Sequence, residues 1–144
     1  MRIRTATKKD IMEIAKLMLE EFSKPPFNEK TTIKSVIKSL NFYFKIGKIF
    51  VAIEDKKIVG IVVFKLEQWW EGSVILIEDL AVKEDFKKQE IGKKLTDDVE
   101  NYGKKMRVKS VSFATNKKSS AVKFYTKQGY KIEKNRIFMR KNLK

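Results

Sequence analysis

The sequence predicts a mixed α/β fold, with a single domain that spans residues 1–144. Three observations predict it: apolar residues recur at helical spacing in four segments, β-branched and aromatic residues gather in runs between them, and turn residues separate the two kinds of segment. A hydrophobic content of 42% with ten Phe and four Tyr favours a compact core over disorder. The expected order is β-α-α-β-β-β-α-β-α-β, and the pattern alone leaves the order of strands in the sheet open.

The first 45 residues are expected to form a short strand and two helices. Residues 2–6 alternate between charged and apolar side chains, as strands do. Asp10 with Glu13 then resembles a capping box, and the apolar residues that follow recur at helical spacing until the chain reaches Pro25. A second helix is expected from about Glu29 to Lys45.

The middle of the chain is expected to form three strands. Two β-rich runs, 49–53 and 58–64, flank a tight polar turn and indicate a hairpin. Gly60 inside the second run indicates a bulge or a close backbone approach. The third strand, about 73–82, is apolar almost throughout, which favours burial on both faces. The remaining elements are expected to be a helix at 91–105, a strand at 108–115, a helix at 119–128 that ends at Gly129, and a final strand at 130–140.

The chain contains no Cys and no His. Their absence excludes disulfides, thiolate metal sites, Cys nucleophiles and every catalytic triad that uses His. Acid–base chemistry near neutral pH therefore depends on Asp, Glu, Tyr, Lys or ordered water. We expect no metal site in this protein.

The net charge of +15 is unevenly distributed along the chain: residues 1–82 carry +3 and residues 83–144 carry +12. An anion-binding function is therefore expected in the second half. One alternative is a basic module that binds nucleic acid or the ribosome. Of the 33 bases, 28 are Lys and 5 are Arg, and this balance disfavours sequence-specific reading of bases, because Arg is the usual residue for bidentate recognition.

We expect a cytoplasmic protein that does not enter a membrane. No apolar run approaches the 18 residues that a membrane span needs, and the first residues lack the apolar core of a signal peptide.

A strand that ends in two carboxylates leads into the start of an amphipathic helix. The strand end reads Glu78-Asp79-Leu80-Ala81-Val82, and the helix start follows Lys87-Lys88-Gln89-Glu90. The first N–H groups of a helix have no partner within it, so they favour an anion such as a pyrophosphate. Glu78 and Asp79 are expected to point to opposite faces of their strand.

These segments match the motifs of a known family. The chain resembles the GNAT superfamily of acyl-CoA-dependent N-acetyltransferases over nearly its whole length. That family follows a strand end such as Leu80-Ala81-Val82 with the motif Arg/Gln-x-x-Gly-x-Gly/Ala, which here reads Lys87-Lys88-Gln89-Glu90-Ile91-Gly92. A later family pattern appears as Ala121-Val122-Lys123-Phe124-Tyr125 with Gly129-Tyr130. Two departures stand out: Glu90 replaces the first Gly, and the family's Asn would fall at Lys118 whereas this chain has Asn116.

The resemblance implies acetyl-CoA as cosubstrate and a sheet that is splayed at the cofactor site. The pantetheine arm would pair with the backbone of Leu80, Ala81 and Val82. The amides of Gln89, Glu90, Ile91, Gly92 and Lys93 would hold the pyrophosphate, and Lys87, Lys88, Lys123 and Asn116 are the further candidates for cofactor contacts. Tyr125 would protonate the departing thiolate, because a phenol pKa near 10 lies above that of a thiol. Glu78 or Asp79 would remove a proton from the acceptor ammonium.

The resemblance implies transfer of an acetyl group to a primary amine by direct attack. In this family the segment between the first two helices, here Pro25-Pro26-Phe27, builds part of the acceptor wall. The acceptor itself stays open between a polyamine-like small amine and a protein amine. A non-catalytic acyl-CoA sensor on the same fold is a further alternative, and a homodimer is compatible with the family.

Overall fold

The computed structural model describes the backbone of residues 1–144 and every side chain except those of Lys88 and Gln89. The chain forms two compact units, Met1–Ala114 and Thr115–Lys144, which are described in turn. In the described part of the chain, no helix has the length and apolar character needed to span a bilayer.

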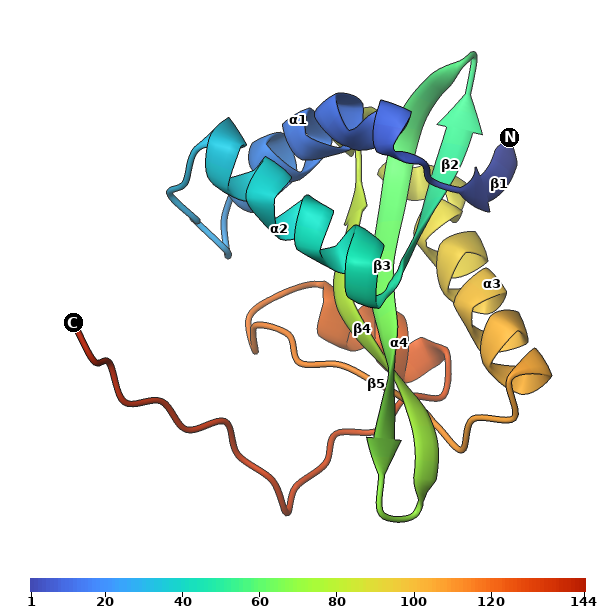
Figure 1. The fold of residues 1–144 in the computed structure, drawn as a ribbon, viewed down its shortest axis with the longest axis vertical. Coiled ribbons are helices and arrows are strands. Elements are labelled where there is room, and N and C mark those ends of the chain that lie inside the picture. The colour runs from blue at the N-terminus through green and yellow to red at the C-terminus, as the bar shows by residue number, and fades with distance from the viewer. The chain divides into compact units, whose positions relative to one another are not determined.

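The first unit is built on a five-stranded mixed sheet in the order β1-β2-β3-β4-β5 (Figure 1). Neighbours are antiparallel except β4 and β5, which run parallel. The long hairpin of β3 and β4 therefore forms the centre of the sheet. The strands are β1 Arg2–Thr5, β2 Lys48–Glu54, β3 Lys57–Trp69, β4 Gly72–Val82 and β5 Val111–Ser112.

Helices cover both faces of this sheet. Helices α1 (Ile11–Phe22) and α2 (Ile33–Ile46) lie on one face, and α3 (Ile91–Lys105) lies on the other (Figure 1). Each face buries its own apolar cluster, because strand side chains alternate between the faces. The cluster under α1 and α2 includes Leu17, Leu40 and Val63, and the cluster under α3 includes Phe64, Leu95 and Val99. Short 3₁₀ segments, η1 (Lys8–Asp10) and η2 (Glu84–Gln89), precede α1 and α3.

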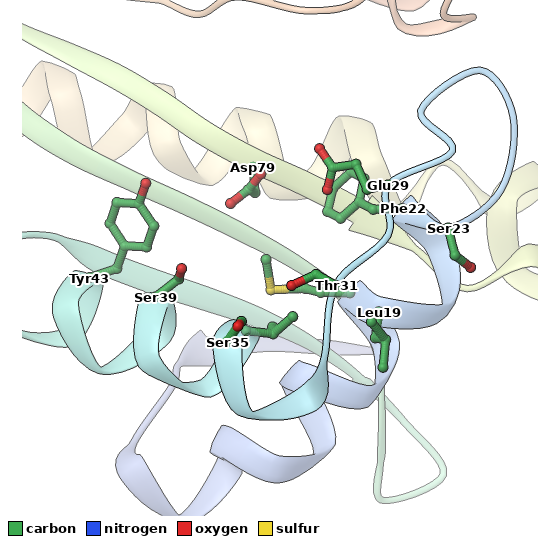
Figure 2. Close-up of a pocket in the computed structure, with 11 residues that line it drawn as sticks. Leu19, Phe22, Ser23, Glu29, Thr31, Ser35, Ser39, Tyr43 and Asp79 are labelled. Atoms are coloured by element: carbon green, nitrogen blue, oxygen red, sulfur yellow. The ribbon is translucent and has the colours of Figure 1, made fainter. Parts of the chain in front are cut away.

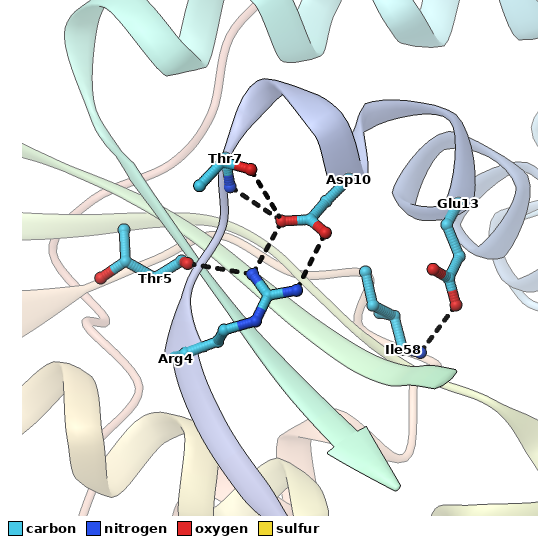
Figure 3. Close-up of polar contacts among 6 residues, drawn as sticks. All are labelled: Arg4, Thr5, Thr7, Asp10, Glu13 and Ile58. Carbon is cyan, nitrogen blue, oxygen red and sulfur yellow. Dashed lines mark hydrogen bonds and ion pairs between the residues drawn. The ribbon is translucent and has the colours of Figure 1, made fainter. Parts of the chain in front are cut away.

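The start of α1 is fixed by Asp10, but not through the predicted pair with Glu13. The Asp10 carboxylate accepts the backbone N–H of Thr7 at 2.8 Å and pairs bidentately with the Arg4 guanidinium at 2.8 and 2.9 Å (Figure 3). Glu13 instead accepts the backbone N–H of Ile58 at 2.7 Å. The predicted box was wrong because the turn begins three residues earlier, so Asp10 is its last residue and Thr7 its cap.

Helix α2 starts later than predicted, at Ile33, where the side chain of Thr32 accepts the N–H of Ser35 at 3.2 Å. Both features predicted for Gly60, a close backbone approach and a bulge, are confirmed. A Cβ there would lie 2.9 Å from the Ile91 side chain, and the β2–β3 register shifts beside it, between Ala52 and Ile53. Gly60 therefore lets α3 pack directly on the backbone of the sheet.

The second unit contains one helix, α4 (Ala121–Lys127). The predicted final strand at 130–140 was wrong: these residues form no strand in the described chain, and 131–144 are exposed. A strand is completed by backbone hydrogen bonds to a neighbouring strand, and no strand is assigned within residues 115–144. The strand predicted at 108–115 is confined to Val111–Ser112.

Candidate active site

Glu78 and Asp79 lie at a β-bulge in β4. Asp79 is opposite Val63 and Ile77 is opposite Phe64, so Glu78 is an extra residue with no partner across the pair. Ile77 packs under α3, whereas Ala81 belongs to the cluster under α1 and α2. The bulge therefore turns both carboxylates toward α1 and α2, and the prediction of opposite faces was wrong because it assumed unbroken alternation.

Glu78 is held by two neighbours. Its Oε1 lies 3.2 Å from Nζ of Lys65, and the hydrogen bond to Glu78 raises the pKa of Lys65. The hydroxyl of Tyr43, on α2, donates to Oε2 of Glu78 at 3.4 Å. Glu78 is thus a charge-paired carboxylate beside the site.

Asp79 lines a cavity of about 240 Å³ between β4 and the first two helices (Figure 2). Burial, followed by the nearby charges of Glu78 and Glu29, raises the pKa of Asp79 to about 7. Burial, followed by the charges of Glu78 and Asp79, raises the pKa of Tyr43 to about 12, so its phenol stays protonated. A carboxyl group with a pKa near neutrality is suited to take a proton from an incoming group.

The rest of the cavity combines hydroxyl groups with an apolar wall. Besides Asp79, its lining residues are Met18, Leu19, Phe22, Ser23, Glu29, Thr31, Ser35, Val36, Ser39 and Tyr43. Sequence reasoning did not select Glu29 or Tyr43 for a site role. The sequence did contain a pattern that predicts one wall of the cavity. Ser35, Ser39 and Tyr43 recur every four residues, so they share one face of α2 (Figure 2).

Strand β4 leaves part of its outer edge without a strand. Among the described residues, β5 pairs with β4 only at Ile75 and Leu76. The segment Leu80–Val82 pairs with β3 on one side and has no strand partner on the other. Its alternation resumes after the bulge: Ala81 is buried under α1 and α2, while Leu80 and Val82 pack under α3. The backbone here is available to an extended molecule laid along the edge.

The start of α3 presents free amides close after this edge. The first helical hydrogen bond runs from Lys94 N–H to Glu90 C=O at 3.1 Å, so the N–H groups of Ile91, Gly92 and Lys93 have no acceptor within the helix. Glu90 has φ 58° and ψ 23°, the left-handed conformation that glycine adopts most easily. Glu90 therefore adopts the backbone conformation that is expected of a glycine at this position. These amides and the dipole of α3 suit a diphosphate.

The side chain of Lys87, a predicted phosphate contact, is paired with carboxylates, and so is the side chain of Lys93, whose predicted contact is through its backbone amide. Nζ of Lys87 lies 3.0 Å from the buried Glu21 and 2.9 Å from Glu84, and Nζ of Lys93 lies 2.9 Å from Asp97. The prediction for the side chain of Lys88 lies outside what the structure describes. The backbone N–H groups of the helix start therefore stay the candidate for binding an anion in this unit.

Three predicted residues belong to the second unit. Tyr125, on α4, is buried, and its ring packs edge-on against Tyr130 with centroids 5.1 Å apart. Burial raises the pKa of Tyr125 above its ordinary value. Lys123 is exposed on the same helix. The side chain of Asn116 accepts the backbone N–H of Lys118 at 2.8 Å, in the turn that leads to α4.

The fold matches solved structures over almost its full length. A possible acetyltransferase from Clostridium difficile 630 shares 17% identity at a TM-score of 0.87, covering 99% of this chain and 98% of that one. An aminoglycoside acetyltransferase from an uncultured soil metagenomic sample shares 23% identity at a TM-score of 0.78, covering 99% and 96%. An aminoglycoside N-acetyltransferase in complex with CoA shares 16% identity at a TM-score of 0.82, covering 97% and 93%.

A comparison with curated protein sequences gives no match. The sequence itself matches the family model of the acetyltransferase (GNAT) domain over residues 45–132, more than half of the chain. This stretch includes the bulge of β4, its open edge and the start of α3. The chain therefore belongs to the GNAT acetyltransferase family.

Proposed function

We propose that this protein transfers an acetyl group from acetyl-CoA to a primary amine by direct attack. The observation that carries the proposal is the edge of β4 at Leu80–Val82, which has no strand partner within the described chain, followed by the first amides of α3, which have no acceptor within the helix. A pantetheine arm needs backbone partners and a diphosphate needs N–H donors, and the chain offers them in that order. A structural relative in complex with CoA supports the cosubstrate.

The diphosphate would bind the amides from Gln89 to Lys93, and the pantetheine would follow the edge of β4. A backbone N–H near Leu80 would polarise the thioester carbonyl, where negative charge develops as the amine attacks. Holding the two reactants together would supply most of the acceleration, because it removes the entropic cost of their encounter.

Asp79 would take a proton from the acceptor ammonium. Its pKa of about 7 lets it accept that proton at neutral pH, while Glu78 stays paired with Lys65. The amine nitrogen then bonds to the carbonyl carbon and the carbon–sulfur bond breaks. Tyr125 would donate its proton to the departing thiolate, and its raised pKa means that the phenol carries a proton to give.

The experiment has two arms. Calorimetric titration with acetyl-CoA should give one site per chain, and incubation with a panel of primary amines should release free CoA thiol. Binding without thiol release from any amine would identify an acyl-CoA sensor and refute acetyl transfer. Failure to bind acetyl-CoA would remove the proposal altogether.

A further inference from the structure

The charge within the cavity is opposite to that of the whole chain. The protein has 33 bases and 18 acids, yet the two charged residues that line the cavity, Glu29 and Asp79, are both acidic. No Lys or Arg is among the described lining residues. The adjacent Glu78 is balanced by Lys65 at 3.2 Å, so the unbalanced negative charge belongs to residues 29 and 79.

Glu29 is held in place at the end of the connection from α1 to α2. Its backbone N–H donates to the carbonyl of Phe22, the last residue of α1, at 2.9 Å. Its carboxylate lies close enough to Asp79 for its charge to contribute to the raised pKa there (Figure 2). No ion pair involves Glu29 within the described chain, so a cation in the cavity would meet an unpaired carboxylate.

The size and walls of the cavity limit what this cation can be attached to. Met18, Phe22 and Val36 provide an apolar wall beside the two carboxylates. The volume of about 240 Å³ lies below the roughly 300–1,000 Å³ of pockets for drug-sized ligands. A narrow aliphatic chain fits within such a space.

We propose that the acceptor is an unbranched aliphatic amine with a second cationic group, and that Glu29 is the specificity-determining residue that binds this second group. The inference rests on the proposed acetyl transfer. The charges balance as follows: the reacting ammonium gives one proton to Asp79 before it attacks, and the other ammonium keeps its charge opposite Glu29. The methylenes between them contact the wall formed by Met18, Phe22 and Val36.

Three amines with a four-carbon chain test this inference: 1,4-diaminobutane with a second cation, n-butylamine with no second charge, and 4-aminobutanoate with an anion. Each is assayed with saturating acetyl-CoA by thiol release. We expect kcat/KM for the diamine to exceed that for butylamine by about tenfold, and the amino acid to be the poorest acceptor. Glu29→Gln should lower kcat/KM for the diamine at least fivefold more than for butylamine, mainly through KM.

Glu20→Gln is the matched control, because it removes the same charge from an exposed position of α1 outside the cavity. It should leave the diamine-to-butylamine ratio as it is in the parent protein. Equal kcat/KM for diamine and butylamine, or thiol release only with peptide or multi-ring amines, would overturn the inference while acetyl transfer stands. Acetyl-CoA binding without thiol release from any amine would overturn both.

Discussion

Replacing Asp79 by Asn should raise the stability of the protein while it lowers the activity. The reason is that the ionised carboxylate of Asp79 destabilises the folded state. The pKa rises from an ordinary 3.8 to about 7, a difference of about 3 units. At about 1.4 kcal/mol per unit this corresponds to about 4 kcal/mol against the ionised form above pH 7. Asp79 keeps some contact with solvent, which screens part of this penalty, so we expect Asp79→Asn to gain about 2 kcal/mol at pH 8.

The sign of the pH dependence follows from the direction of the shift. A carboxyl group whose pKa is raised by folding binds more protons in the folded state than in the unfolded state. The contribution of Asp79 to the free energy of unfolding is therefore fully present below the unfolded pKa of about 4, and it is lost as pH rises through about 7. Asp79→Asn should therefore match the parent protein near pH 4 and become more stable as pH increases. For a chain of this length, 2 kcal/mol corresponds to about 6 °C in the melting temperature.

Thermal unfolding at pH 4, 6 and 8 measures this difference, with Asp98→Asn as the control, because Asp98 lies on α3, outside the cavity. Turnover measured in parallel should fall about 10²-fold or more if residue 79 is the base, and kcat/KM of the parent should rise as pH passes 7. A variant that is less stable at pH 8, or that keeps parental turnover, would refute the reasoning.

Three further changes address the cofactor side and its support. Tyr125→Phe should lower kcat about 10²-fold with little change in the calorimetric Kd for CoA, and unchanged turnover would remove the phenol from the mechanism. Glu90→Gln removes a like charge beside the diphosphate and should tighten CoA binding up to about fivefold; weaker binding would count against an anion at the start of α3. Glu21→Gln should cost about 1 kcal/mol in urea unfolding because it weakens the pairs with Lys24 and Lys87, whereas Glu20→Gln, on the exposed side, should cost less than about 0.5.

Local patterns predicted most of the elements, because each depends on neighbours close in sequence. The helix at 91–105 matches α3, and the hairpin is present with its glycine packed under Ile91. The final strand at 130–140 was wrong because strand formation depends on a partner elsewhere, and alternation cannot reveal whether that partner exists. The same limit applies to Asp10, whose bidentate partner Arg4 belongs to a different element.

The candidate site was predictable to the extent that it follows from backbone position. Leu80–Val82 and the start of α3 were selected from their motif; within the described chain Leu80–Val82 has a strand partner on one side, and the first N–H groups of α3 have no acceptor within the helix. Glu29 and Tyr43 were not selected, because their relation to Asp79 arises only when α1 and α2 pack on the sheet. The side chain of Lys87 was expected to contact phosphate, and in the structure its Nζ lies 3.0 Å from a carboxylate oxygen of Glu21, a residue from another element that the local pattern does not reveal.

A single inserted residue links the two halves of the proposed reaction. Without the bulge at Glu78, alternation would send Asp79 to the α3 side, into the apolar cluster that contains Ile77 and Phe64. With it, Asp79 faces the cavity while Leu80 and Val82 keep their packing under α3. The bulge lies just after the end of the pairing with β5, so the carboxylate and the strand edge that the proposed reaction uses follow one another in β4.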